Sequence, residues 1–163
     1  MVTSTNNGST LVIKCIIGIS VCLGLGFVSG ILSGSGLVEW YQTLNKPFFQ
    51  PPSWVFGPAW TILYTLMGIS IARIWHLNNS LQKNKEIKLF VSQFAINLIW
   101  SPVFFAFRQP LIALIIIIVM LILIAMTIHS FKKIDKLAAI LLLPYILWVS
   151  FATLLNASIV YLN

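Results

Sequence analysis

The residues with the most evident chemistry are indoles and side-chain amides that recur at helical spacing within apolar sequence. Two stripes with steps of four residues are Gln93, Asn97 and Ser101, and Trp148, Ala152 and Asn156. Side chains four apart lie on one face of a helix. A buried indole N–H or amide needs a hydrogen-bond partner inside the protein. These stripes therefore indicate either polar contacts that hold helices together or the lining of a ligand pocket, and both readings stay open.

A third group of aromatic residues lies between Trp40 and Trp60, where the sequence has three of the six tryptophans and four of the seven prolines. Proline fixes φ and restricts the residue before it, so this stretch is predicted to be a stiff loop. Stiffness lowers the ordering cost of binding a ligand. The alternative is that these aromatic side chains anchor the protein at the membrane surface. Tyr64 follows Trp60 at helical spacing and extends the group into the next helix.

Several other chemistries are disfavoured by what the sequence contains. No pair of carboxylates is expected within the membrane, and His76 and His129 are far apart without metal-ligand spacing. Hydrolase and ion-driven pump functions are therefore disfavoured, and no metal site and no cofactor are predicted. The formal charge of +7 reflects ten basic against three acidic residues. In a membrane chain such a surplus follows loop topology, so no nucleic-acid partner is predicted.

Composition identifies the elements that must position these residues. The 163 residues are 59% hydrophobic and only 8% charged, which indicates an integral membrane protein embedded in a lipid bilayer. A spanning helix needs about 20 apolar residues. Five such segments predict an all-α membrane protein, a five-transmembrane-helix bundle forming a single domain over 1–163. The segments lie near 11–33, 54–76, 88–107, 110–131 and 137–162, with an aromatic capping loop at 34–53.

Finer expectations concern individual helices. Gly26, Gly30 and Gly34 repeat at a spacing of four, which favours close helix packing within the bundle over a dimer contact. Pro102 is expected to kink the third span. The fourth span, 110–131, is nearly featureless and is expected to be the most lipid-exposed. Trp100 and Trp148 are expected near the middle of the bilayer.

Eight of the ten basic residues fall at the N-terminus and in the second and fourth loops. The remaining two, Lys46 and Arg108, fall in the first and third loops. The positive-inside rule then places the N-terminus in the cytoplasm and the aromatic loop on the outer side. We expect the membrane to be a bacterial cell membrane.

Three separated segments carry a resemblance to a known family. They are WYQTLNKPFFQPPSWVFGPAWTILYTLMG from Trp40, NLIWSPVFF from Asn97 and LLPYILWVSFATLLN ending at Asn156. In this order they resemble the translocator protein family, also called the tryptophan-rich sensory protein or TspO/MBR family. The resemblance implies a five-helix bundle, often a homodimer, whose first loop caps a pocket for porphyrins and synthetic ligands. Some members also bind sterols.

Carried onto this sequence, the resemblance implies a ligand-binding set and two tryptophans with a catalytic role. Bacterial relatives are associated with light- and oxygen-dependent breakdown of protoporphyrin, in which the tryptophans matching Trp40 and Trp148 are implicated. The binding set is Tyr41, Trp60, Tyr64, Asn97, Ser101, Phe104 and Ala152. Other bacterial relatives can have Asn at the position of Ser101, so the ligand contact here is expected to be shorter or weaker. Tyr161 lacks the following basic residue of the animal sterol motif.

The resulting hypothesis is a membrane protein that binds a protoporphyrin IX-type tetrapyrrole, or another lipophilic small molecule. A binding or sensing role and photo-oxidative degradation of the porphyrin both remain open, so the sequence does not decide whether the protein is an enzyme. The alternative is a transporter or binder of sterol-like or other lipophilic molecules. Transport is less favoured because no row of intramembrane polar residues is long enough to predict a path.

Overall fold

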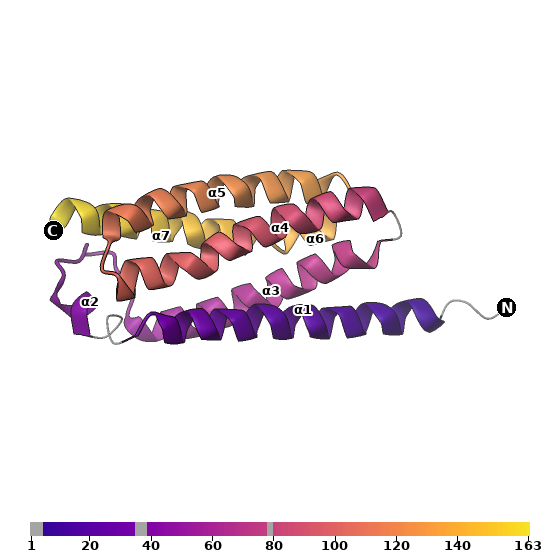
Figure 1. Ribbon diagram of the computed structural model, residues 1–163, viewed down its shortest axis with the longest axis horizontal. Helices are drawn as coiled ribbons and strands as arrows, with labels where there is room; N and C mark the ends of the chain where they lie inside the picture. The colour runs from indigo at the N-terminus through magenta and orange to yellow at the C-terminus, as the bar shows by residue number, and fades with distance from the viewer. Residues whose placement is uncertain (1–4, 35–38, 78–79) are drawn as a thin grey trace.

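The computed structural model describes residues 5–34, 39–77 and 80–163, and it is a bundle of helices aligned along one axis (Figure 1). Within these residues, five helices are long and apolar enough to cross a membrane, which confirms the predicted all-α membrane bundle. The helices in chain order are α1 (Thr5–Leu32), α2 (Glu39–Thr43), η2 (Ser53–Val55), α3 (Phe56–His76), α4 (Ser80–Ser101), η3 (Pro102–Ala106), α5 (Pro110–Lys132), α6 (Lys136–Ile140) and α7 (Leu143–Leu162).

The order of the helices brings the first loop and the end of α7 to the same end of the bundle. In Figure 1, α2 lies at this end, next to the C-terminal end of α7 and the turn between η3 and α5. The opposite end holds α6 and the C-terminal ends of α3 and α5. The short α2 therefore lies where it can cover the end of the bundle at which α7 also ends.

Helices α1 and α3 approach each other closely because glycines face each other at their contact. A Cβ atom added to Gly68 would lie 2.5 Å from the backbone of Ile19, and one added to Gly18 would lie 2.4 Å from the Gly68 carbonyl oxygen. Small residues allow such backbone approach in membranes. Packing within the bundle, predicted for the Gly26 repeat, holds for Gly26 but is wrong for Gly30, whose Cβ would meet open space. The third glycine of the repeat, at 34, ends α1 with a φ of +61°.

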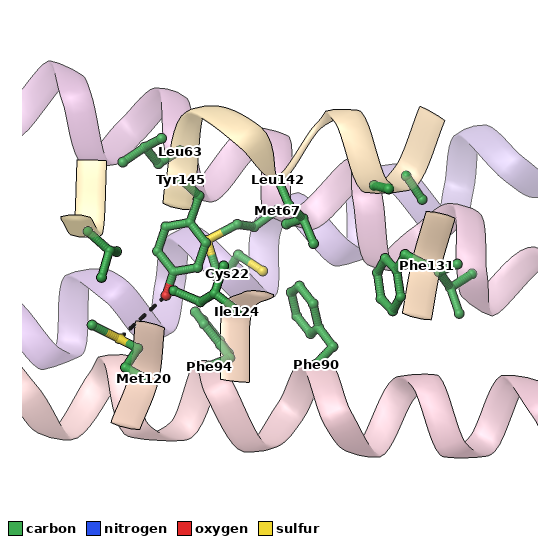
Figure 2. Packing of buried hydrophobic residues seen from close by; sticks show 14 of the residues in the cluster. Cys22, Leu63, Met67, Phe90, Phe94, Met120, Ile124, Phe131, Leu142 and Tyr145 are labelled. Atoms are coloured by element: carbon green, nitrogen blue, oxygen red, sulfur yellow. Dashed lines mark hydrogen bonds between the residues drawn. The ribbon is translucent and has the colours of Figure 1, made fainter. Parts of the chain in front are cut away.

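A hydrophobic core fills the half of the bundle away from α2. Figure 2 shows Phe90 of α4 between Phe94 of the same helix and Phe131 of α5, and the Phe90 ring stacks on these two rings at centroid distances of 6.0 Å and 6.3 Å. The fully buried Tyr145 hydroxyl of α7 donates to the Met120 sulfur at 3.6 Å. Apolar side chains thus join α4, α5 and α7 directly in this half of the bundle.

The third span differs from its prediction at both ends. Helix α4 begins at Ser80, although the third span was predicted to begin near residue 88. Lys and Glu are good helix formers, so a polar helical turn extends beyond the apolar segment.

At the other end of the third span, Pro102 starts a wide π-helical turn in which the Phe107 N–H donates to the Pro102 carbonyl at 3.0 Å. Trp100 lies six residues before the end of the span at Ala106.

Two further expectations need correction. Helix α5 is not the most lipid-exposed span, because it buries a regular stripe of Ala113, Ile117, Met120, Ile124, Thr127 and Phe131. Helix α1 is the least buried of the five spans found among the described residues. High hydropathy alone does not separate a lipid-facing helix from a central one. The fifth span is interrupted between α6 and α7, because Pro144 lacks the N–H that would bond to the Ile140 carbonyl.

Candidate functional site

A cavity of about 640 Å³ lies at the α2 end of the bundle, between α1, α3, α4 and α7. Its volume falls within the range of about 300–1,000 Å³ that is typical of small-molecule sites. The residues that line it are Leu23, Gly26, Phe27, Ser29, Gly30, Tyr41, Ser53, Phe56, Gly57, Trp60, Thr61, Tyr64, Asn97, Trp100, Ser101, Phe104, Phe105, Trp148, Ala152, Leu155, Asn156 and Ile159.

The cavity brings together most of the residues singled out in the sequence. All seven residues of the predicted binding set line it: Tyr41, Trp60, Tyr64, Asn97, Ser101, Phe104 and Ala152. Trp148, predicted as a catalytic residue, lines it as well. These side chains come from α2, α3, α4, η3 and α7, so the stripes seen in the sequence converge on one space.

Trp40 is placed differently from the rest of the predicted set. It is absent from the cavity lining, and its ring meets the edge of Phe104 with centroids 5.7 Å apart. Tyr41, its neighbour in α2, meets Phe104 at 6.0 Å and Phe105 at 5.4 Å, and it does reach the cavity. Trp40 therefore stands behind Phe104, one ring away from the cavity.

One wall of the cavity is fixed by Tyr64 and Asn97. The Tyr64 hydroxyl donates to the Asn97 Oδ1 at 2.9 Å, which joins α3 to α4. The Tyr64 ring stacks on Trp60 with centroids 5.1 Å apart. On its other side the ring lies against Gly26 of α1, where an added Cβ would come within 2.2 Å of it. The absence of a side chain at Gly26 thus makes room for the tyrosine that shapes this wall.

Ser101 uses its hydroxyl for contact between helices. Its Oγ lies 2.6 Å from the Oγ of Ser33, and Ser29 donates to the Leu98 carbonyl at 2.7 Å. These bonds connect α1 to α4 along the edge of the cavity. A hydroxyl keeps further acceptor capacity after one such bond. Ser101 therefore fits both interpretations of the polar stripe of α4, because it holds two helices together and also lines the cavity.

The indole N–H groups at the cavity differ in whether they have a hydrogen-bond partner within the protein. Trp100 Nε1 donates to Asn156 Oδ1 at 3.3 Å, and Asn156 Nδ2 donates to the Pro110 carbonyl at 2.8 Å. Among the described residues, no acceptor lies in hydrogen-bond contact with the N–H of Trp60 or Trp148. These two indoles can therefore offer both an aromatic face and a donor to a molecule in the cavity.

The sequence did not predict that helix α1 contributes to the site. It supplies Leu23, Gly26, Phe27, Ser29 and Gly30 to the lining. None of these residue types signals ligand chemistry, and the glycine spacing indicates only close packing. The start of α3 was also missed, where Phe56 meets Trp148 with ring centroids 5.8 Å apart. A signal for this contact did exist in the aromatic stretch between Trp40 and Trp60.

The lining is suited to an apolar, aromatic molecule rather than to acid–base chemistry. The residues that form it include no carboxylate, imidazole or cationic side chain. Within the described part of the chain, no three His, Cys, Asp or Glu side chains lie close enough to hold a metal ion. At the edge of the site, Lys46 Nζ lies 5.0 Å from the centre of the Tyr41 ring. Burial raises the pKa of the Tyr41 phenol, which stays protonated and able to donate at neutral pH.

The polar stripe of α4 continues beyond the cavity to Glu86. Glu86, Gln93 and Asn97 are all buried, with exposed fractions of 3%, 1% and 4%. Their spacing of seven and four residues puts them on one helical face. No described atom hydrogen-bonds either end of the Gln93 amide or the Glu86 Oε2. Buried polar groups are rarely left unpaired, so this face is suited to holding water.

Comparison with known proteins agrees with this architecture. The TspO/MBR family matches residues 18–162. The tryptophan-rich protein TspO of Chlorobaculum tepidum is 39% identical over 149 residues, which cover 89% of this chain and 92% of the relative. The tryptophan-rich sensory protein of Cereibacter sphaeroides is 40% identical over 125 residues, 77% of each chain. The human translocator protein is 36% identical over 136 residues, 82% of this chain and 80% of the relative.

Proposed function

The chain belongs to the TspO/MBR family of integral membrane proteins, and on that premise we propose that it binds a protoporphyrin-type tetrapyrrole in the cavity beside α2. The observation that carries the proposal is the lining itself. It combines a large apolar and aromatic surface with two available indole donors, on Trp60 and Trp148. A flat aromatic ligand gains most from such walls through burial and ring stacking. The whole chain acts in this proposal as one membrane domain.

Photo-oxidative breakdown of the bound porphyrin is the second part of the proposal. Trp148 has direct access to the cavity, whereas Trp40 is separated from it by Phe104. Indole is more easily oxidised than the other aromatic side chains in the lining. An excited porphyrin next to Trp148 can therefore take an electron from it or pass energy to oxygen nearby. Trp148 is proposed as the catalytic residue in the first instance, and Trp40 as a secondary one.

Transport or binding of a sterol-like molecule is the alternative function. The lining is free of charged groups, which suits a neutral lipophilic molecule as well as a porphyrin. The buried polar groups of Gln93 and Glu86 favour a path that continues below the cavity. A competition experiment distinguishes the two ligand classes. It compares the concentrations at which a sterol and a second porphyrin displace bound protoporphyrin. Displacement by sterol at lower concentration than by a second porphyrin would favour the alternative.

Titration of purified protein with protoporphyrin in the dark tests the main proposal. Bound porphyrin should quench the fluorescence of Trp60 and Trp148, since both line the cavity. Saturable quenching at micromolar concentration or below is the expected result. Quenching that rises linearly with porphyrin, as expected when porphyrin only partitions into the detergent micelles, would show that the polar stripes serve only to hold the helices together.

Assembly and orientation complete the proposal. We propose a homodimer in a bacterial cell membrane, with the N-terminus in the cytoplasm and α2 on the outer side. The distribution of eight of ten basic residues supports this orientation. Labelling a cysteine introduced at Phe48, which is fully exposed next to α2, with a membrane-impermeant reagent tests it in whole cells. Labelling that occurs only after cell lysis would contradict this orientation and place α2 on the cytoplasmic side.

A further inference from the structure

The first loop is tied to the end of α7 by a reciprocal set of hydrogen bonds. The Asn45 backbone N–H donates to the Asn163 Oδ1 at 2.9 Å, and the Asn163 Nδ2 donates to the Asn45 carbonyl at 3.1 Å. Asn163 Nδ2 also donates to the Ile159 carbonyl of its own helix at 2.9 Å, which holds the side chain in place. A single side-chain amide thus pairs with both backbone groups of one loop residue.

This contact lies directly after the element that covers the cavity. Helix α2 has only five residues, and so short a helix is not stable by itself. Its position depends on the ring contacts of Trp40 and Tyr41 with Phe104 and on Leu44, which packs on the same cluster. Asn45 follows Leu44 at once. The Asn163 amide therefore fixes the point at which the chain leaves α2.

We propose that Asn163 is a positioning residue that latches α2 over the cavity and thereby sets the rate at which ligand enters and leaves. The inference rests on the proposed function, since it assumes that the cavity beside α2 is where ligand binds. Opening of the latch breaks the two hydrogen bonds to the Asn45 backbone and the longer bond from Asn45 to Leu162. It also separates the α2 side chains from the Phe104 cluster. The total cost is still smaller than that of unpacking a transmembrane helix. Tyr41 then moves away from the cavity together with α2.

The bonding pattern predicts an unequal effect of changing the two asparagines. Both main latch bonds use the side chain of Asn163 but the backbone of Asn45. The Asn45 side chain contributes only a longer bond of 3.3 Å to the Leu162 carbonyl. Asn163→Ala should therefore open the latch, whereas Asn45→Ala should leave it largely intact. Asn163→Asp keeps an acceptor for the Asn45 N–H, but its second carboxylate oxygen replaces the donor and faces the Asn45 and Ile159 carbonyl oxygens. The resulting repulsion should open the latch at least as far as Asn163→Ala does.

Stopped-flow quenching by protoporphyrin, with the purified full chain in detergent, tests this order. Asn163→Ala should raise the dissociation rate constant roughly fivefold to tenfold, as expected for two lost hydrogen bonds, and the rise for Asn163→Asp should be at least as large. Asn45→Ala should change it by less than about twofold, within the range of one weak exposed bond. Ser158→Ala is the matched control, because it removes only the exposed bond to Leu154 within α7. Its rate should equal that of the wild type.

A readout without ligand separates the latch from the proposed function. Amide hydrogen exchange over residues 40–44 should be faster in Asn163→Ala than in the wild type, while exchange in α3 and the melting temperature stay unchanged. If protoporphyrin fails to bind the wild-type protein but exchange responds in this way, the proposed function fails and the latch stands. If both exchange and dissociation rates of Asn163→Ala match the wild type, the latch is refuted and ligand enters by another route.

Discussion

The Tyr64 hydroxyl of α3 donates a hydrogen bond to Asn97 of α4 at 2.9 Å, while the ring of the same tyrosine lies against Gly26 of α1. Three helices therefore meet at one side chain at the wall of the cavity. The glycine provides the space, the ring fills it, and the hydroxyl pairs with the amide. Any side chain at Gly26 must displace the Tyr64 ring and with it the bond to Asn97.

Substitution of Gly26 tests this dependence. Gly26→Ala should destabilise the protein by about 1–3 kcal/mol, the usual cost of overpacking, and should weaken porphyrin binding. Gly24→Ala is the control, because a Cβ at Gly24 meets no atom within 4 Å. Thermal melting in detergent, followed by circular dichroism, measures the effect on stability. Equal melting temperatures for the two variants would mean that the Tyr64 ring can move aside at little cost in free energy.

Trp148→Phe should separate binding from photochemistry. Phenylalanine keeps an aromatic face but is harder to oxidise, so dark affinity should fall by about 1 kcal/mol at most. Loss of porphyrin absorbance under illumination should fall much further, and Trp40→Phe should have a smaller effect because Phe104 separates Trp40 from the cavity. Trp75→Phe is the control, since Trp75 packs with Lys14 near the opposite end of the bundle. Normal turnover by Trp148→Phe would assign the photochemistry to another group.

Lys46 and Arg108 are expected to pair with the propionates of a bound porphyrin, as the two basic residues predicted on the α2 side. Changing both to Gln should lower affinity by about 1 kcal/mol at low salt, the upper value for exposed ion pairs. The effect should shrink as salt rises and should be absent for protoporphyrin dimethyl ester, which lacks the charges. Lys85→Gln, in the turn of α4 at the opposite end, serves as control. Unchanged affinity of the double variant at low salt would show that both cations only border the membrane.

The ion pair at the far end of the bundle should make stability depend on acid pH. Arg73 Nη2 lies 2.8 Å from Asp135 Oδ2, and Asp135 caps α6 through the N–H groups of Leu137 and Ala138. Partial burial raises the pKa of Asp135, but the Ala138 hydrogen bond and the Arg73 guanidinium outweigh it, so the pKa lies below its ordinary value.

Because the folded-state pKa of Asp135 is lowered, its ionised form stabilises the folded protein at neutral pH. This contribution should disappear as the pH falls below the unfolded-state pKa of about 4 and through the lower folded-state pKa. Asp135→Asn keeps the cap and removes the charge, so it should melt below the wild type at pH 7 and approach it in acid. A constant difference between pH 7 and pH 3 would contradict this assignment.

Helical spacing predicted which aromatic and amide side chains share a face, because spacing along a helix is a local property, whereas their gathering at one pocket was implied by the family resemblance. Steps of four put Asn97 and Ser101, or Trp148 and Ala152, on one face whatever the rest of the chain does. The structure places all four at one cavity. The five spans were predictable for a similar reason, since each depends on its own hydropathy.

Features that depend on distant contacts were not predictable. Trp40 stands behind Phe104 because α2 rests on η3, and nothing in the loop sequence indicates which of two adjacent aromatic residues faces inward. Asn45 and Asn163 are 118 residues apart, and exposed asparagines have no pattern that indicates a pair. Part of the predicted capping loop, residues 35–38, lies outside the described residues.

Blocking the cavity gives the most direct test of the claim that porphyrin binds there. Ala152 lines the cavity, so Ala152→Phe should fill part of it, whereas Ala95→Phe places the same ring on the exposed face of α4. The measurement is tryptophan quenching by protoporphyrin in the dark for both variants and the wild type. We predict saturable quenching for the wild type and Ala95→Phe, and a loss of saturable quenching for Ala152→Phe in protein that remains folded. Saturable quenching of equal affinity in all three proteins would contradict binding in this cavity.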